Sequence, residues 1–254
     1  HGVHRRQRQM CIRDSPSGAI QCPPDNLTGA FMRTLHHHPL YASSRTIRLM
    51  LAERGLVFMP KLESPWERHD DFLTMNPAGT VPVLVTEDGI VLSGAMVIAE
   101  FIEETEDSAN SLIWGGAAER AEIRRLTDWF ESKFLSEVGT PLLNERYVKR
   151  VSNSGNPSSE VMRAALTNLN IHLNYIDWLA EQGNWLAGKA MSLADLSAAA
   201  HLSVTDFFGD IDWSRHPEAK NWYAKIKSRP AFRELLADGV VGIAAAPHYT
   251  DLDF

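Results

Sequence analysis

Three consecutive histidines are the residues of this 254-residue chain that most readily suggest metal chemistry. They fall in a predicted strand over Arg33–His38, where His36 and His38 share one face and His37 points to the other. Two imidazoles without a neighbouring carboxylate make a poor zinc site. We therefore predict no metal centre here.

The positions of the two cysteines exclude cysteine chemistry from most of the chain. Cys11 and Cys22 both precede Met32, so residues 32–254 contain no thiol. This excludes disulfides, cysteine–metal sites and a cysteine nucleophile from that part of the chain. A redox enzyme with a cysteine beside its first helix is excluded for the same reason.

Hydroxyl groups gather where the first predicted helix, Ser43–Leu56, begins. Tyr41, Ser43 and Ser44 lie at this start, where the helix dipole stabilises a nearby anion. In one interpretation a serine caps the helix and Tyr41 packs at its entry. In the other, one of these hydroxyls is catalytic, and the residues alone leave both open.

A second stretch predicts two strands and a helix. The apolar runs Val81–Val85 and Ile90–Leu92 flank an Asp88-Gly89 pair, which is a strong hairpin signal. Apolar residues over Ala95–Ile102 then recur at helical spacing. If the peptide bond before Pro82 is cis, the backbone of Val81 is free to pair with an extended ligand.

Taken together, Asn76–Gly79, Val81–Leu84, Asp88-Gly89 and Ile98–Ile102 resemble the glutathione-transferase superfamily. The resemblance implies a thioredoxin-like α/β domain followed by an all-α domain. It also implies that Val81 pairs with the cysteinyl backbone of glutathione and that Pro82 is cis. Tyr41 or Ser44 would be the catalytic residue that activates the thiol.

One departure from the superfamily pattern bears on function. Members carry a Glu-Ser pair that holds the γ-glutamyl group, and here the pair is replaced by Gly94 and Ala95. Neither side chain offers a carboxylate or a hydroxyl, so we expect a degenerate glutathione site. Backbone N–H groups at the start of that helix still favour a carboxylate. We therefore expect weak glutathione binding and no required cofactor.

Changes in amino-acid composition along the sequence divide the chain into segments. Residues 1–31 resemble neither a signal peptide nor the remainder, and we interpret them as a non-native leader before Met32. Residues 32–108 are predicted to form the thioredoxin-like domain and 117–246 the helical domain, with a 247–254 tail. Ser192–Asp195 predicts a capping box that begins a buried helix of the second domain.

Charge and hydropathy exclude two classes of partner. Residues 1–31 contain four arginines and two aspartates, which gives a net charge of +2. The whole chain has a net charge of −7, so residues 32–254 carry a net charge of −9. An acidic body argues against nucleic acid. No apolar run approaches the roughly 20 residues that span a bilayer. We predict a cytoplasmic protein that does not insert into membranes.

Trp66 and the chain end suggest a binding role. Within the superfamily, the Pro65–Arg68 motif and the ending resemble alphaproteobacterial proteins that bind the division tubulin FtsZ. This resemblance implies a homodimer that binds FtsZ or another division protein without glutathione turnover. The alternative is a transferase that conjugates glutathione to a small electrophile. The predicted protein-binding residues are Trp66, His248, Tyr249, Asp251, Leu252, Asp253 and Phe254.

Overall fold

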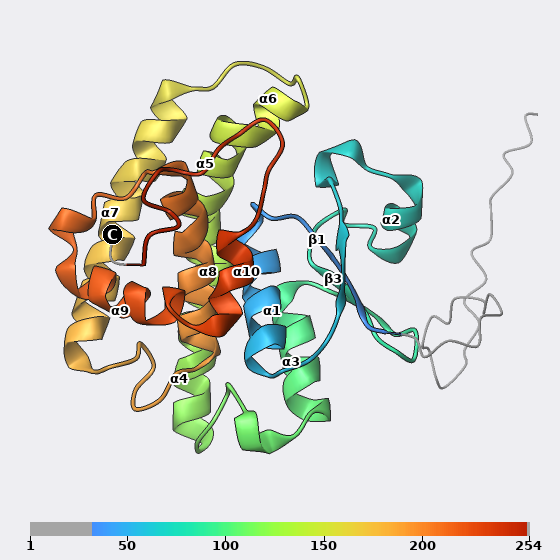
Figure 1. Cartoon of the computed structure of the whole chain (residues 1–254), viewed down its shortest axis with the longest axis vertical. Coiled ribbons are helices and arrows are strands. Elements are labelled where there is room, and N and C mark those ends of the chain that lie inside the picture. Colours follow the sequence, from blue (N-terminus) through green and yellow to red (C-terminus); the bar gives the residue numbers. More distant parts are fainter. Residues whose placement is uncertain (1–31, 253–254) are drawn as a thin grey trace, which may run out of the picture.

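The computed structural model describes residues 32–252. The predicted leader, both cysteines, Asp253 and Phe254 lie outside the described residues. Within them, a small sheet with flanking helices occupies the first part of the chain, and helices alone form the rest (Figure 1).

The sheet has four strands in the order β2-β1-β3-β4. β1 and β2 are parallel, and the other two pairings are antiparallel. The turn between β3 and β4 contains Gly89 at φ +79°, a backbone conformation that suits glycine. The strands are Thr34–His37 (β1), Met59–Leu62 (β2), Val83–Val85 (β3) and Val91–Ser93 (β4).

Three helices accompany the sheet. Figure 1 shows α1 and α3 between the sheet and the helical bundle, with α2 on the opposite side of the sheet. The apolar faces of α1 and α3 are buried in the continuous core that also contains the bundle. The helices are Ala42–Glu53 (α1), Asp70–Met75 (α2) and Ala95–Thr105 (α3).

The helical part begins with one long, nearly continuous helix that runs from Ala117 to Val151. Its segments Trp129–Gly139 and Asn144–Val148 have wider, π-type turns. Such turns are frequent at functional sites. The remaining segments of this part are Ala117–Asp128 (α4), Thr140–Leu143 (α5), Lys149–Val151 (α6), Ser159–Gln182 (α7), Leu193–Phe208 (α8), Pro217–Lys227 (α9) and Arg233–Leu236 (α10).

Helix α8 is the centre of the bundle, and almost all of its residues are buried. It begins at the predicted capping box, in which Asp195 accepts hydrogen bonds from the backbone N–H and the hydroxyl of Ser192. The same carboxylate accepts from the Leu186 N–H and the Trp222 indole N–H. Asp195 therefore ties the start of α8 to two other segments.

The predicted fold, a thioredoxin-like domain followed by a transferase-type helical domain, is confirmed. One local prediction was wrong. Neither Ser43 nor Ser44 caps α1, because the helix begins one residue earlier and Tyr41 occupies the N-cap position. In the described residues, no helix is long and apolar enough to cross a membrane.

Candidate functional site

A cleft of about 530 Å³ lies where α1, α3 and the long helix of the second part meet. The first part contributes the entry to α1, the turn before β3 and the start of α3, and the second part contributes the π-type segment and α8. The lining includes Leu40–Ser43, Thr80–Pro82, Gly94–Val97, Asp128, Glu131, Ser132, Leu135, Gly139, Thr140, Leu143, Asn144, His201 and Val204.

The four residues predicted for glutathione binding all line this cleft. The Val81–Pro82 peptide bond is cis. Within residues 32–252, the N–H and C=O of Val81 have no hydrogen-bond partner. Gly94 is the N-cap of α3 at φ +91°, and Ala95 is the first residue of that helix. The backbone features of the site are thus present, without the acidic and hydroxyl side chains.

The candidate catalytic hydroxyls occupy different environments. Tyr41 lines the cleft, and burial, followed by the nearby Tyr147, raises the pKa of its phenol to about 12. Ser44 is fully buried, has no partner for its hydroxyl among the described residues and does not line the cleft. Only Tyr41 of these two candidates can therefore contact a ligand there.

Ser43 faces the cleft but is already engaged. Its hydroxyl donates to Oε2 of Glu131 at 2.6 Å. Oε1 of the same carboxylate accepts from the hydroxyls of Thr46 at 2.7 Å and Ser197 at 3.0 Å. His201 Nε2 lies 3.3 Å from Oε1. Glu131 therefore joins α1 to the helical part at the wall of the cleft.

This carboxylate is ionised although its side chain is only 7% exposed. Burial by itself would raise the pKa of Glu131. The charge and hydrogen bond of His201, together with the hydroxyls of Ser43 and Thr46, outweigh that effect and lower the pKa to about 2. The wall of the cleft thus contains an ionised carboxylate, paired with His201, beside the first turn of α1.

Trp66 belongs to a cluster of aromatic side chains that also contains His38 and Tyr147. Its ring meets His38 at a centroid distance of 5.1 Å and Tyr147 at 5.6 Å, both in edge-to-face geometry. Tyr147 comes from the helical part, and Trp66 is half-buried. Trp66 therefore contacts both parts of the molecule while keeping some surface exposed.

The chain end is fastened to the body by two of the predicted protein-binding residues. His248 Nε2 lies 3.0 Å from Oδ1 of Asp206. Tyr249 is fully buried, where its hydroxyl accepts from Arg45 at 2.9 Å and donates to the Leu235 carbonyl at 3.1 Å. In this conformation Tyr249 anchors the tail and has no surface for a partner.

The last described residues of the tail, Asp251 and Leu252, are exposed. Among the predicted protein-binding residues they are therefore accessible to a partner, together with the exposed parts of Trp66 and His248. The tail and Trp66 lie on segments that pack against one apolar cluster, which includes Leu40, Tyr147 and Tyr249.

The three side chains of the histidine triplet are all buried. Burial, followed by the charges of Arg48 and Arg45 respectively, lowers the pKa of His37 and of His38 to about 4. Within residues 32–252, no group of three or more histidine, cysteine or acidic side chains is placed to hold a metal.

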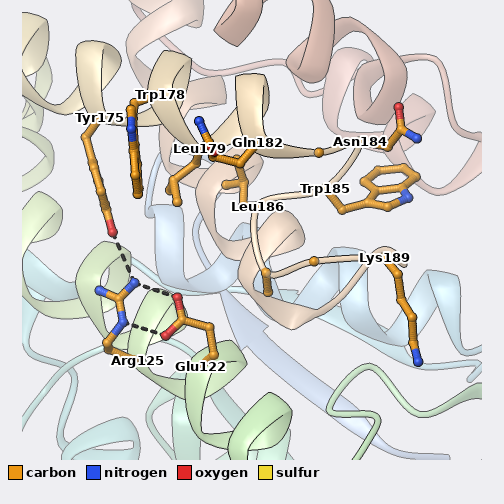
Figure 2. Close-up of a pocket in the computed structure, with 13 residues that line it drawn as sticks. Glu122, Arg125, Tyr175, Trp178, Leu179, Gln182, Asn184, Trp185, Leu186 and Lys189 are labelled. Carbon is orange, nitrogen blue, oxygen red and sulfur yellow. Dashed lines mark hydrogen bonds and ion pairs between the residues drawn. The ribbon is translucent and has the colours of Figure 1, made fainter.

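A second cavity, of about 820 Å³, lies between α4, the end of α7 and the loop that follows (Figure 2). Arg125 forms a two-bond ion pair with Glu122 and donates to the hydroxyl of Tyr175. Tyr175 stacks on Trp178 with 12° between the rings. This cavity does not adjoin the residues predicted for glutathione binding.

Sequence reasoning missed Glu131 and His201. Glu131 lies 85 residues from Thr46 and 88 from Ser43, so no local motif connects them. The one local signal is that Glu131 directly follows Phe130 in the long helix from Ala117 to Val151. That signal does not identify the residues with which Glu131 interacts.

Comparison with known proteins gives two matches to family models. The glutathione S-transferase N-terminal domain matches residues 42–105, and the glutathione S-transferase C-terminal domain matches residues 145–239. The chain is also 47% identical to FtsZ-localized protein A of Caulobacter vibrioides over 225 residues, which cover 87% of this chain and 98% of that protein.

Solved structures agree with these matches. A glutathione S-transferase from Rhodospirillum rubrum F11 matches with a TM-score of 0.85 at 47% identity. The match covers 88% of this chain and 100% of that protein's chain. FzlA from C. crescentus has the same TM-score, identity and coverage. With both parts matched by family models, and with relatives this similar over nearly their whole length, the chain belongs to the glutathione S-transferase family.

Proposed function

We propose that this chain is a binding module of bacterial cell division that binds FtsZ filaments in the cytoplasm and requires no cofactor. The observation that carries the proposal is the 47% identity to FtsZ-localized protein A over 98% of that protein. The geometry of the cleft supports it, because Ser43 is engaged by Glu131, and Gly94 and Ala95 offer no polar side chain for glutathione.

Thiol activation needs a group that stabilises or generates a thiolate. The Ser43 hydroxyl donates to Glu131 instead, and Ser44 is buried away from the cleft. The raised pKa keeps the Tyr41 phenol protonated near neutral pH, so it does not act as a base for the thiol proton. Tyr41 is thus the one of the three hydroxyls that lines the cleft and can still donate a hydrogen bond to a thiolate.

Glutathione recognition is weakened at the start of α3. Gly94 and Ala95 supply no side-chain partner for the charged γ-glutamyl end. Charge-assisted hydrogen bonds contribute about 1.5–3 kcal/mol each, so the loss of two corresponds to several kcal/mol of binding free energy. The backbone of the site remains, which is why weak glutathione binding is still expected.

Two measurements on the full chain test the function. Co-sedimentation with GTP-assembled FtsZ filaments should pellet the protein, and calorimetry with glutathione should show no heat at micromolar ligand. Micromolar glutathione binding together with no co-sedimentation would contradict the proposal. Serum albumin at the same concentration is the control for trapping in the pellet.

The tail and Trp66 form the proposed contact surface. Ending the chain after Thr250 removes Asp251–Phe254 but keeps the buried Tyr249, and circular dichroism of the truncated chain checks its fold. We expect this truncation and Trp66→Ala each to weaken co-sedimentation. Removal of 247–254 is a poorer test, because it also removes the buried Tyr249. Unchanged binding in both variants would refute this choice of surface.

The second candidate function is glutathione transfer to a small electrophile. The cis peptide bond at Pro82 and the unpaired backbone of Val81 favour it. In this case Tyr41→Phe should reduce turnover of 1-chloro-2,4-dinitrobenzene and leave FtsZ co-sedimentation unchanged. If the wild-type chain has no turnover above the uncatalysed rate, this alternative is excluded for that substrate.

The proposal includes a homodimer. Helix α7 exposes Ile171 and Trp178, seven residues apart and so on one face. Light scattering after gel filtration should give twice the chain mass, and Trp178→Glu should shift it toward the monomer. Val241→Glu, which places the same charge on a more exposed residue outside this face, is the control. A dimer unaffected by Trp178→Glu would place the interface elsewhere.

A further inference from the structure

The turn after α10 presents an apolar side chain to solvent. Val240 and Ile243 pair as an isolated antiparallel bridge, and Gly242 between them has φ +83°, which suits glycine in a tight turn. Both bridge residues pack against the apolar cluster that includes Tyr249. Val241, at the tip, is 89% exposed, the largest exposed fraction among the large apolar side chains of the described chain. The turn is therefore held in place on one side and exposed on the other.

Arg150, near the end of the long helix, fastens this turn. Its Nη2 donates to the carbonyl of Gly242, and Figure 1 shows the segment after α10 passing beside α5 and α6. Among the described residues, the exposed guanidinium has no other hydrogen bond and no carboxylate partner. Since a guanidinium has five N–H donors, Arg150 keeps its charge and most of its donors for an external acceptor.

Two further cations precede Arg150 on the same helix. Arg146 pairs with Asp210, and Lys149 pairs with Glu145. The two carboxylates are only 3% and 5% exposed, whereas the side chains of Arg146 and Lys149 are 37% and 28% exposed. Residues three or four apart neighbour one another on a helix surface, so Arg146 lies beside both other cations. The exposed face of this helix end is therefore positive, although the whole chain has a net charge of −7.

The chemistry of this surface favours an acidic peptide over other anions. Nucleic acids and anionic membranes present continuous rows of phosphates, and binding to them relies on many cations. Here three cations stand on a chain of net negative charge, so long-range attraction to such a polyanion is opposed. Val241 gains nothing from a phosphate backbone, whereas contact with an aliphatic side chain of a peptide would remove it from water.

We propose that this surface binds an acidic segment of a partner protein, with carboxylates on either side of an aliphatic residue. We call it the turn surface, and it consists of Arg146, Lys149, Arg150 and Val241. The guanidinium of Arg150 pairs with a carboxylate of the segment, and Val241 packs against its aliphatic side chain. Trp66, in the proposed contact surface, packs against the same apolar cluster as the bridge residues of the turn, which places the two surfaces near each other. The inference rests on the proposed function in one respect, since the partner is FtsZ.

The first test reverses the charge of Arg150. With Arg150→Glu, the apparent affinity for GTP-assembled FtsZ filaments in co-sedimentation should fall about tenfold or more. Arg120→Glu makes the same change at an exposed arginine near the start of the long helix, and its affinity should stay within about twofold of the wild type. Equal affinities of the wild type and Arg150→Glu, or equal losses in the two variants, would overturn the proposal.

Val241 tests the sign of the charge without removing the hydrogen bond that fastens the turn. Its side chain is almost fully exposed, so Val241→Glu and Val241→Lys should both fold, which circular dichroism checks. An acidic segment is repelled by the glutamate and attracted by the lysine, so Val241→Lys should bind FtsZ filaments about tenfold more tightly than Val241→Glu. Equal affinities of these two variants would overturn the charge complementarity, whether or not Arg150→Glu folds.

Two capped tripeptides, acetyl-Asp-Leu-Asp-amide and acetyl-Asn-Leu-Asn-amide, test the chemistry without FtsZ. Calorimetry with the full chain at low salt should show about tenfold tighter binding of the aspartate peptide, and Arg150→Glu should abolish this preference. Equal affinities for the wild-type chain would overturn the proposal. Sedimentation with phosphatidylserine vesicles distinguishes the source of the negative charge. Vesicle binding that Arg150→Glu abolishes, without a preference for the aspartate peptide, would overturn the assignment of the turn surface to a protein segment.

The peptide and filament assays separate this inference from the proposed function. If the wild type binds FtsZ filaments and the variants of Arg150 and Val241 bind them equally well, the inference fails and the proposed function stands. If the aspartate peptide is preferred in a manner that depends on Arg150, but FtsZ does not co-sediment, the turn surface stands and the partner has been misassigned.

Discussion

Two acidic residues, Asp195 within helix α8 and Glu131 beside that helix, have different surroundings. Asp195 is fully buried, and its partners Leu186, Ser192 and Trp222 all belong to the helical part. Glu131 takes two of its hydrogen bonds from α1, in the other part, and lies on the wall of the cleft. One carboxylate is sealed within a domain, and the other stands between two domains.

The pKa values follow this difference. Burial raises the pKa of Asp195 in spite of its hydrogen bonds. For Glu131 the effect of burial is outweighed by His201 and by two hydroxyls, and its pKa falls to about 2. The carboxylate of Asp195 joins segments of one domain, whereas that of Glu131 joins the two domains at the wall of the cleft.

The largest effect expected from this comparison is on stability. Asp195→Ala leaves several buried donors without an acceptor at the start of α8. Each unsatisfied donor costs about 1–3 kcal/mol, so the free energy of unfolding should fall by about 4 kcal/mol. Urea denaturation followed by circular dichroism measures this change. The control is Glu160→Ala, which replaces an exposed acidic residue on α7. A loss of unfolding free energy below about 1 kcal/mol for Asp195→Ala would contradict the stabilising role given to its buried hydrogen bonds.

The second effect is a pH dependence that belongs to Glu131. Its pKa is about 2 in the folded chain and 4.5 ordinarily, so the unfolded state binds the proton more readily. The stability contributed by its ionised form is fully present above pH 4.5 and is lost as the pH falls toward 2. The loss amounts to about 3 kcal/mol, since one pKa unit corresponds to about 1.4 kcal/mol.

Other carboxylates titrate in the same range, so the measurement is a difference. The unfolding free energies of the wild type and of Glu131→Gln are compared between pH 5 and pH 3. The advantage of the wild type should shrink as the pH falls. A constant difference over this range would show that the charge of Glu131 is not held by the contacts described above.

How far sequence reasoning reached depends on how local each signal is. The capping box at Ser192–Asp195 and the hairpin at Asp88-Gly89 occupy four residues or fewer, and both were predicted. Superfamily resemblance added the cis peptide bond at Pro82 and the position of Gly94 at a helix start. These features depend on neighbouring residues or on a family pattern.

Features that depend on tertiary contact were missed or misplaced. A serine was predicted to cap α1, but the Ser43 hydroxyl instead donates to Glu131, 88 positions away. Tyr249 was predicted to bind a partner, yet the buried guanidinium of Arg45, 204 positions away, bonds its hydroxyl inside the molecule. Neither partner can be identified from local spacing, because the contact exists only after the two domains pack.

A third, smaller effect extends the comparison to the tail. Tyr249→Phe keeps the ring but removes the hydroxyl that accepts from Arg45 and donates to the Leu235 carbonyl. A buried charge and a carbonyl then each lose a partner, and the free energy of unfolding should fall by about 2 kcal/mol. Thermal or urea denaturation measures this, and Tyr175→Phe, whose hydroxyl bonds the exposed Arg125, should change stability less. Equal effects would mean that the tail anchor is no stronger than a surface contact.

The smallest effect separates two adjacent serines on α1. Ser43→Ala removes one of the donors to Glu131, and with Thr46, Ser197 and His201 still in place the cost should be about 1 kcal/mol. Ser44→Ala removes a buried hydroxyl that has no partner among the described residues, so stability should be unchanged or slightly higher. Urea denaturation of the two variants side by side measures the difference. If Ser44→Ala is the more destabilising, the role of Ser43 as a donor to Glu131 is refuted, and with it the view that α1 gives its first-turn hydroxyls to a protein carboxylate rather than to a ligand.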